Sequence, residues 1–298
     1  MVLHDSEDVV HPLELTLFDR LIGRAGVIQL PVVPLVDPDS HWISGHYCDE
    51  FAEAHGKELV VREAVGAAIP LAGVGCAIAR EPLARLAAAH EGRPFAGASM
   101  TEDYEMGLRI GALGVKTMFV RIPATPGDRA MVASRGHFPA SLDAAVRQKA
   151  RWLGGIALTG WDRLGWGRGW GERWMRLRDR RGPLAALLLI AGYTAGLLWS
   201  QLWLAEALGA PIQARMDPRL LLLLLNITGV LLVWRIVMRA AFTTTVYGWR
   251  QGLLSVPRLV VANLIAVLAT LRAVSIYMSG GATRWDKTRH IFPAELAR

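Results

Sequence analysis

Two long apolar runs, at residues 184–208 and 220–238, constrain this chain more than any other feature of its sequence. Each run is long enough to cross a hydrocarbon core of about 30 Å as a helix. The chain has 298 residues, of which 52% are hydrophobic, and the apolar excess is concentrated after Pro183. The part before Pro183 has the composition of an ordinary globular domain. We therefore predict one folded domain followed by membrane helices.

A third apolar stretch, residues 259–278, is interrupted by Arg272, so that only residues 259–271 are free of charge. A run of that length is more typical of a re-entrant or interfacial helix than of a span. Basic residues follow both the second and the third stretch. If both groups are cytoplasmic, the third stretch cannot cross the membrane. We predict two spans and one interfacial helix; three spans is the alternative.

The distribution of positive charge indicates a lipid partner. The formal net charge is +7 and the pI is about 9.9, a balance that nucleic-acid binding could also explain. Many of the arginines, however, lie just before the first apolar run: Arg163, Arg168, Arg173, Arg176, Arg178, Arg180 and Arg181. Arginines beside a membrane helix mark its cytoplasmic side and favour anionic lipid. We therefore expect a lipid bilayer as partner and no nucleic acid.

The segment at residues 161–182 combines tryptophan with arginine and glycine. Trp170, Trp174 and Leu177 fall on one helical face, with arginines around the rest. This pattern is typical of a helix that lies in the membrane interface. The alternative is an ordinary amphipathic helix that packs on the soluble domain.

Residues 1–160 alternate between strand-like and helix-like segments. Such alternation predicts an α/β layered domain. Residues 161–182 then form the amphipathic interface segment, residues 183–278 the membrane helices, and residues 279–298 a cytoplasmic tail.

The compartment is indicated by two further features. Cys48 and Cys76 show no disulfide framework spacing, which fits a reducing compartment. The first residues have neither a basic nor an apolar leader region, so we expect no signal peptide. We therefore predict a multi-pass membrane protein whose folded domain lies on the reducing, cytoplasmic side.

The first acidic cluster, at residues 4–8, contains Asp5 and Glu7 directly after a short apolar segment. Carboxylates spaced by one residue at the end of a strand point the same way and can share a divalent cation. Mg²⁺ and Mn²⁺ prefer such oxygen ligands and commonly bind phosphate as well. A solvated loop or a helix cap is the alternative.

The second cluster begins a predicted helix with Thr101, Glu102 and Asp103. An acid at this position could serve as a general base if its surroundings tune its pKa. Simple helix capping explains the cluster equally well.

The third cluster places Gln148, Arg151 and Trp152 within about one helical turn. The planar guanidinium of arginine matches phosphate oxygens, and tryptophan can stack on a sugar face. An Arg-Trp pair alone would be unremarkable.

Taken in order, these clusters resemble the D-x-D, T-E-D and Q-x-x-R-W signatures of processive-type family 2 glycosyltransferases, the group that includes cellulose and hyaluronan synthases. The T-E-D and Q-x-x-R-W matches are complete, whereas the first motif reads Asp5-Ser6-Glu7. Residues 4–12, residues 73–75 and the tail Trp285-Asp286-Lys287-Thr288-x-His290 are similar to bacterial inner-membrane glycosyltransferases of the phage adsorption protein B-like group. The tail motif resembles a mobile loop over the active site of related synthases, which implies a cytoplasmic position.

The resemblance implies a GT-A (Rossmann-like) α/β domain followed by an α-helical membrane region. It further implies a multi-pass protein of the bacterial inner membrane whose catalytic domain is cytoplasmic. It also implies an inverting transfer from a nucleotide-sugar donor, with UDP as the expected nucleotide, to a glycan acceptor. Asp103 would be the base, and Asp5 and Glu7 would hold Mg²⁺ or Mn²⁺ with the donor diphosphate. The donor and acceptor would be bound by the remaining motif residues, which are Thr101, Glu102, Gln148, Arg151 and Trp152. Gly73 and Gly75 would allow a sugar to approach the backbone, although tight packing would explain them equally well.

One departure from the family concerns the start of the domain. The family fold usually begins well before the D-x-D motif, with a segment that binds the nucleotide base, whereas here the motif lies at position 5. We therefore expect an incomplete domain whose sheet has an exposed edge and an uncovered face. Weak nucleotide binding and weak activity would follow for this chain alone. A partner fragment that supplies the missing half, or an outer-membrane export protein, would then be expected.

Two functions remain open at this point. The leading hypothesis is an inverting membrane glycosyltransferase that builds a cell-envelope polysaccharide. The alternative is a non-catalytic membrane scaffold or export partner derived from such a transferase.

Overall fold

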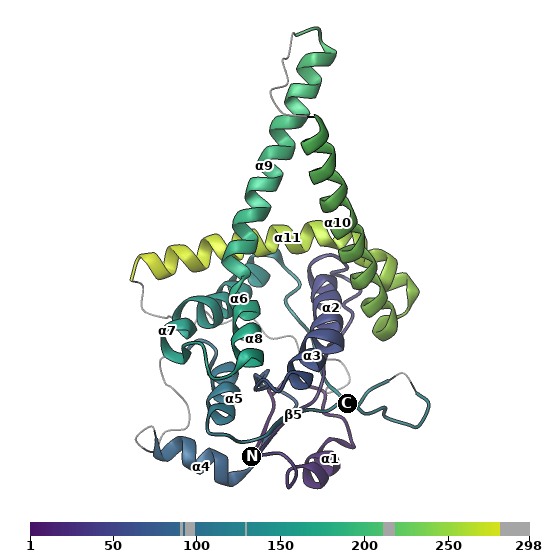
Figure 1. Cartoon of the computed structure of the whole chain (residues 1–298). Helices are drawn as coiled ribbons and strands as arrows, with labels where there is room; N and C mark the ends of the chain where they lie inside the picture. Colours follow the sequence, from purple (N-terminus) through teal and green to yellow (C-terminus); the bar gives the residue numbers. More distant parts are fainter. Residues whose placement is uncertain (90–91, 93–98, 129, 211–217, 281–298) are drawn as a thin grey trace.

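The computed structural model describes residues 1–89, 92, 99–128, 130–210 and 218–280. A four-stranded sheet with the order β1-β4-β2-β5 lies at the end of the molecule away from the long apolar helices (Figure 1). β4 pairs antiparallel with both β1 and β2, and β5 is parallel to β2. The strands are β1 (Val2–Leu3), β2 (Val27–Gln29), β4 (Cys76–Ile78) and β5 (Thr117–Phe119). A second, parallel pair consists of β3 (Val32–Pro34) and β6 (Ser134–Gly136).

Helices cover both faces of the central strands. Ile28 packs with Phe18 of α1 (Glu14–Leu21), whereas Val27 packs on the opposite face with residues of α4 (Arg80–Ala88) and α5 (Glu102–Ala112). Successive strand residues point to opposite faces, so strands buried on both sides are apolar throughout. The expectation of an uncovered face is therefore wrong for β2 and β4. Val2 of the edge strand β1 is exposed, as an edge position predicts.

A helical layer joins the sheet to the long apolar helices. It contains α2 (Ile43–Glu53), the π-helical turn η1 (Ala54–Glu58), α3 (Leu59–Ala64), α6 (Leu142–Leu153), the π-helical turn η2 (Gly154–Thr159) and α7 (Gly160–Leu164). Ser141 caps α6 by accepting a hydrogen bond from the backbone N–H of Ala144 at 3.4 Å. Tyr47 of α2 and Ala145 of α6 pack together in one buried cluster with Ile265.

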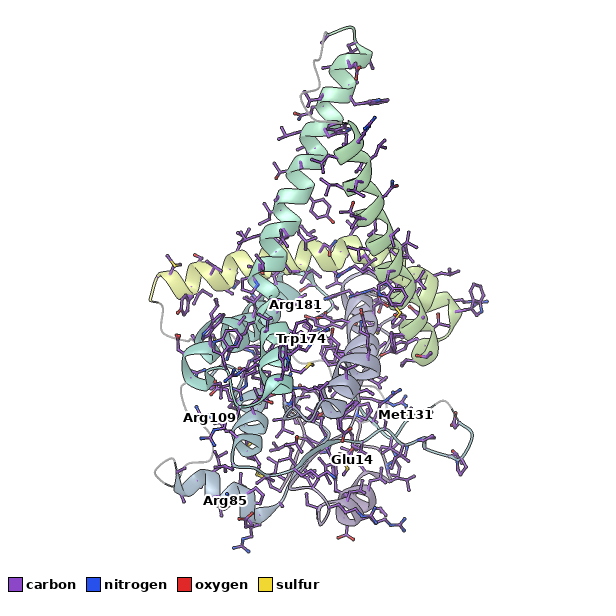
Figure 2. The ribbon with its side chains drawn as sticks, viewed as in Figure 1. Glu14, Arg85, Arg109, Met131, Trp174 and Arg181 are labelled. Carbon is purple, nitrogen blue, oxygen red and sulfur yellow. The ribbon has the colours of Figure 1, made fainter. Side chains whose placement is uncertain are left out.

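Helix α8 (Trp170–Arg180) packs on the folded domain and also presents an aromatic face. Met175 and Arg176 are buried, while Trp170 is 77% exposed and Trp174 is 45% exposed. Figure 2 places Trp174 and Arg181 near the foot of the first long apolar helix. One face of α8 thus packs on the folded domain, and its other face is exposed. Contact of the exposed face with a membrane stays a prediction.

Within the part of the chain that the structure describes, three helices are long and apolar enough to cross a membrane: α9 (Gly182–Ala207), α10 (Pro218–Tyr247) and α11 (Trp249–Met278). α9 and α10 project from the domain as a pair, and their apolar side chains are largely exposed (Figures 1 and 2). Exposed apolar surface of this extent indicates contact with lipid. The prediction of an α/β domain followed by membrane helices is confirmed.

Helix α11 has a different placement from α9 and α10. It lies crosswise at their base and packs along the folded domain (Figure 1). Ile265, Ala269 and Ala273 are buried against α2, α6 or η2, whereas Val260 and Leu271 on the other side are exposed. The tail motif, Trp285 to His290, lies outside the described residues.

Candidate active site

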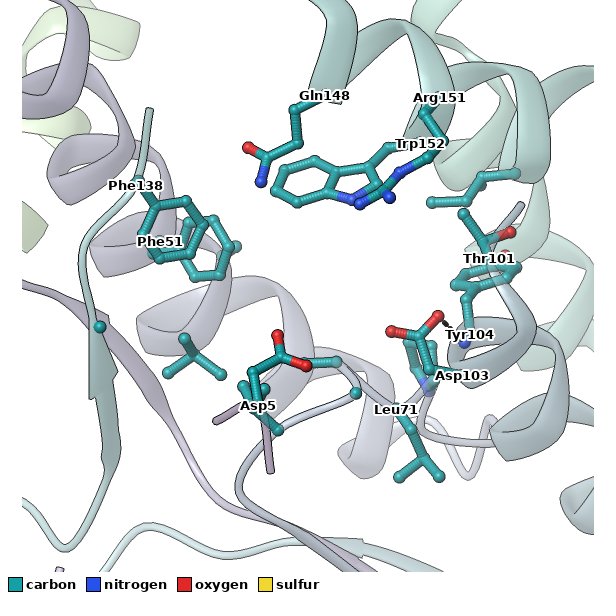
Figure 3. A pocket seen from close by; sticks show the side chains of 18 of the residues that line it. Asp5, Phe51, Leu71, Thr101, Asp103, Tyr104, Phe138, Gln148, Arg151 and Trp152 are labelled. Atoms are coloured by element: carbon teal, nitrogen blue, oxygen red, sulfur yellow. Dashed lines mark hydrogen bonds between the residues drawn. The ribbon is translucent and has the colours of Figure 1, made fainter. Parts of the chain in front are cut away.

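The three sequence motifs meet at one cavity of about 850 Å³ between the sheet and the helical layer. The predicted site residues that line it are Asp5, Glu7, Gly73, Thr101, Glu102, Asp103, Gln148, Arg151 and Trp152. Figure 3 shows Asp5 and Asp103 on one side of the cavity, with Gln148, Arg151 and Trp152 opposite them. Segments far apart in the sequence therefore face a common space large enough for a ligand.

The loop after β1 presents Asp5 and Glu7 to the cavity. The Asp5 N–H donates to a carboxylate oxygen of Asp8 at 3.0 Å, and the Ser6 hydroxyl donates to Glu7 Oε2 at 3.0 Å. His4 lies between Asp8 and the buried Glu14, and the proximity of these two carboxylates raises its pKa to about 9. His4 is therefore protonated at neutral pH and ties the loop to α1.

The donor set at this loop is suited to a hard divalent cation. Among the residues that the structure describes, no group of three or more His, Cys, Asp and Glu side chains could hold a metal by itself. Mg²⁺, however, is usually held by one or two carboxylates together with substrate phosphates and water. Asp5 and Glu7 match that smaller protein contribution, because both carry oxygen ligands into the same cavity.

Gly73 lies where a side chain would displace the candidate base. Its φ is +80°, and a Cβ atom built there would lie 2.7 Å from Asp103 Oδ2. Gly75 has a φ of +58°, and its Cβ would instead meet Ser134 at 2.9 Å. Gly75 is not among the residues that line the cavity. The two glycines thus differ: Gly73 makes room for a carboxylate of the site, and Gly75 permits close packing behind it.

Asp103 lies in the first turn of α5, where its Oδ1 accepts a hydrogen bond from the Tyr104 N–H at 2.8 Å. Burial raises the pKa of Asp103 to about 6, and the neighbouring Glu102 carboxylate acts in the same direction. The backbone hydrogen bonds and the positive charge of Arg151 oppose this rise. A carboxylate with a pKa near 6 is ionised at neutral pH and still basic enough to accept a proton.

Thr101, the residue before α5, packs against the π-helical turn η2 that follows α6. Its side chain is buried, and a Cβ on Gly155 in η2 would clash with its hydroxyl oxygen. The T-E-D and Q-x-x-R-W motifs are thus packed against each other at their ends. Single π-helical turns often occur at functional sites, and η2 follows the Q-x-x-R-W motif directly.

Gln148 and Arg151 project from α6 into the cavity (Figure 3). Gln148 Oε1 is buried and has no hydrogen-bond partner among the described residues. A buried polar atom without a partner carries an energetic cost that a ligand hydroxyl or N–H could relieve. The amide and the guanidinium together offer hydrogen-bond groups for a polar ligand.

Trp152 belongs to an aromatic group beside these polar residues. Its ring lies 6.3 Å from Phe51 and 6.5 Å from Phe138 between centroids, and all three side chains line the cavity. Tyr47 contacts the same tryptophan edge-on at 6.2 Å. These contacts hold the indole in place and leave the cavity with aromatic surface on which a sugar ring can stack.

The cavity wall also contains a hydrogen-bonded group that was not predicted from the sequence. Arg62 and Tyr104 line the cavity and both donate hydrogen bonds to Asp179, which lies 117 positions after Arg62. No spacing links them in the sequence. The one sequence feature that could have drawn attention to this group is the position of Tyr104, directly after Asp103.

The family model described as glycosyl transferase family group 2 matches residues 1–271. The chain belongs to this family. The match extends from the carboxylate loop through α5 and α6 into α11, so it includes each element that forms the cavity. The recognition made from the three motifs is confirmed.

Two curated relatives extend the comparison. The chain is 36% identical to bacteriophage adsorption protein B of Escherichia coli strain K12 and to bacteriophage N4 adsorption protein B of Escherichia coli O157:H7. Each alignment covers 98% of this chain and 42% of the relative. The chain thus spans less than half the length of these relatives, and the similarity to the phage adsorption protein B-like group is confirmed.

Proposed function

We propose that this glycosyltransferase-family protein inverts the anomeric centre of a nucleotide sugar while transferring the sugar to a cell-envelope glycan. The observation that carries the proposal is the convergence of the three motifs on one cavity, where Asp103 has a pKa near 6. A UDP-linked donor is proposed on the resemblance of the motifs alone.

The chemistry requires one base and no covalent intermediate. Asp103 accepts the proton of the acceptor hydroxyl as that oxygen attacks the anomeric carbon. The bond from the anomeric carbon to the diphosphate oxygen breaks, and the nucleoside diphosphate leaves with the electron pair. Asp5 and Glu7 would hold Mg²⁺ or Mn²⁺, which when bound would neutralise charge on the leaving diphosphate.

The remaining motif residues bind and orient the two substrates. Arg151 is proposed to contact the diphosphate, because its planar fork matches phosphate oxygens. Gln148 uses its buried amide oxygen to accept a hydrogen bond from a sugar hydroxyl, and the aromatic surface of Trp152 stacks on the acceptor ring. Thr101 and Glu102 shape the cavity around the base. Gly73 leaves space for the Asp103 carboxylate. Gly75 does not line the cavity and allows the chain behind the cavity wall to pack closely.

The membrane arrangement is also a proposal. Two spans, α9 and α10, and an interfacial α11 are supported by the crosswise placement of α11 on the folded domain. The exposed tryptophans of α8 support contact with the same bilayer surface. The arginines that precede α9 support a cytoplasmic position of the domain, and the bacterial inner membrane is proposed on the resemblance of the motifs. An outer-membrane export protein as partner remains part of the proposal.

Turnover of nucleotide sugars tests the function. The protein reconstituted in lipid is incubated with Mg²⁺ or Mn²⁺, a glycan acceptor and each of several UDP-sugars, and the released nucleoside diphosphate is measured. Asp103→Asn is expected to lower kcat by about 10²- to 10⁴-fold. Asp143→Asn, an exposed change on α6, is the matched control and should leave kcat unchanged.

The outcome distinguishes the transferase from a non-catalytic scaffold. Release that depends on the acceptor and on Asp103 supports the transferase. Equal turnover in Asp103→Asn and in the wild type would refute the assigned base. Binding of glycan without turnover of any donor would favour the scaffold.

A further inference from the structure

Helix α8 presents two opposite faces to two different surroundings. Trp170, Trp174 and Leu177 share the exposed face. Met175 and Asp179 lie on the other face and form part of the cavity wall. Helix α8, which contains none of the recognised motifs, therefore lines the same cavity as Asp103.

The carboxylate of Asp179 is the acceptor in a compact group of hydrogen bonds. Arg62 Nη1 donates to both of its oxygens, at 2.9 and 2.8 Å, and the Tyr104 hydroxyl donates to Oδ2 at 2.6 Å. Arg62 is only 2% exposed. Hydrogen bonds between ionised partners are short and strong, and burial protects them from screening.

Tyr104 connects this group directly to the candidate base. Its backbone N–H donates to Asp103 Oδ1 at 2.8 Å, while its side chain ends at Asp179. Burial raises the pKa of Tyr104 well above its usual value, so the hydroxyl stays protonated and continues to donate. The position of α8 is thus transmitted through one residue to the first turn of α5.

A second set of contacts reaches Asp103 from the other side. Glu172 of α8 accepts the Ala68 N–H at 2.9 Å, and Arg62 Nε donates to the Ala68 carbonyl at 2.6 Å. The chain then passes so close to α5 that a Cβ on Gly107 would lie 2.5 Å from the Ile69 carbonyl oxygen. Gly73, which accommodates the Asp103 carboxylate, follows a few residues later.

We propose that α8 is the positioning element for the base, and that Asp179, Arg62 and Tyr104 are positioning residues that hold Asp103 in the cavity. This inference rests on the proposed function. The three residues move no proton in the reaction. They fix the direction of the carboxylate, and small displacements of a reacting group can lower a rate by about 10²-fold.

Tyr104→Phe tests the inference with the smallest change. The variant keeps the ring and the backbone donor and removes only the hydroxyl, whereas Asp179→Asn would leave the buried Arg62 charge without its counterion. We expect kcat to fall by about 10- to 100-fold, with the donor KM changed by less than about twofold. The acid limb of the pH–rate profile should move to lower pH, because a loosened Asp103 regains contact with water. Tyr193→Phe on α9 is the matched control, since its hydroxyl bonds to Asn263, away from the cavity.

Hydrogen–deuterium exchange gives a readout that does not require turnover. In the lipid-reconstituted protein, Tyr104→Phe should increase exchange in peptides from the start of α5 and from residues 68–73, and Tyr193→Phe should not. Increased exchange confined to α8, or an unchanged kcat in an active enzyme, would overturn the inference. An inactive wild type would instead refute the proposed function, and the exchange result would still decide whether α8 holds α5.

Discussion

Gly73 and Asp103 show how one missing side chain shapes the candidate site. The Asp103 carboxylate occupies the space that a Cβ at Gly73 would enter, at 2.7 Å from Oδ2. The positive φ of Gly73 adds a second constraint, because residues with a side chain rarely adopt it. The position therefore requires glycine for two separate reasons, and only one of them concerns the base.

Gly73→Ala separates these two reasons when compared with Gly114→Ala. Both glycines have a φ of +80°, but a Cβ at Gly114 meets no atom within 4 Å. We expect both variants to lose a similar amount of stability, about 1 kcal/mol or more. Only Gly73→Ala should also lower kcat, by about 10-fold or more, because it displaces the carboxylate.

The measurement combines thermal unfolding with nucleotide-sugar turnover for both variants. Equal kcat values for Gly73→Ala and Gly114→Ala would contradict the role given to Gly73. A common loss of thermal stability with unequal kcat would support it.

The sequence predicted the motif residues that line the cavity, but it did not predict the hydrogen bonds that position them. Motif residues could be recognised because Asp103, Arg151 and Trp152 occur within short fixed patterns. Arg62 and Asp179 could not, since their partnership depends on the packing of α3 against α8. The role of Gly73 was left between two explanations, and neither named Asp103 as its neighbour.

At the scale of elements, α8 and α11 each have one face on the domain and one face exposed. The sequence of α8 predicted an apolar and a basic face, but periodicity does not identify the neighbour of each face. In the structure Arg176 and Met175 turn inward, and Trp170 turns outward. Arginine that is buried here makes internal hydrogen bonds, such as those from Arg176 to Glu172 and to the Leu164 carbonyl.

Arg258 shows that a basic residue near an apolar stretch need not be an exposed charge beside the membrane. Arg258 is one of the basic residues that follow the second apolar stretch, but it lies within α11 and is 1% exposed. It pairs with the buried Asp49 of α2 at 2.8 Å and donates to the Gly45 carbonyl at 3.0 Å. The charge therefore fixes α11 to the domain, which favours an interfacial helix over a lipid-exposed span.

Single-cysteine labelling tests the placement of α11. With two spans, Arg250→Cys and Ser279→Cys at the two ends of α11 should react from the same side of the membrane. Leu208→Cys, beyond the end of α9, should react only from the opposite side. The reagent is a membrane-impermeant maleimide applied to oriented membrane vesicles, and Cys48 and Cys76 are both buried.

Labelling of Ser279→Cys from the side of Leu208→Cys would mean that α11 crosses the bilayer. That result would contradict the two-span arrangement and establish three spans. The unmodified protein is the control for background reaction of the native cysteines.

At the scale of the whole molecule, the cavity lies between the sheet and the helices that contact α11. The carboxylate loop and Gly73 come from the sheet side, and Gln148 and Trp152 come from α6, which packs on α11. Alternating sequence patterns predicted the α/β class. They did not predict the antiparallel position of β4 between β1 and β2, because the segment that contains β4, residues 71–78, has small apolar residues and two glycines without strand periodicity. Coverage of both sheet faces was also missed, since it depends on how α1, α4 and α5 return to the strands.

The assembled cavity makes the Asp103 carboxylate more basic than that of a solvated aspartate. Burial raises its pKa from the usual 3.8 to about 6. The base acts in its ionised form, so activity is present above this pKa and is lost as the pH falls through about 6. The expected profile therefore has an acid limb near pH 6, about two units above that of a solvated aspartate.

The pH dependence of kcat/KM for nucleotide-sugar turnover tests this account most directly. Wild-type protein in lipid is measured between pH 4.5 and pH 8, with Asp103→Asn assayed in parallel. We predict that log kcat/KM rises with pH and levels off above about pH 6 in the wild type, and that Asp103→Asn loses both the activity and this limb. A wild-type profile that stays flat down to pH 4.5, or a limb near pH 6 that persists in Asp103→Asn, would contradict the assignment of Asp103 as the base.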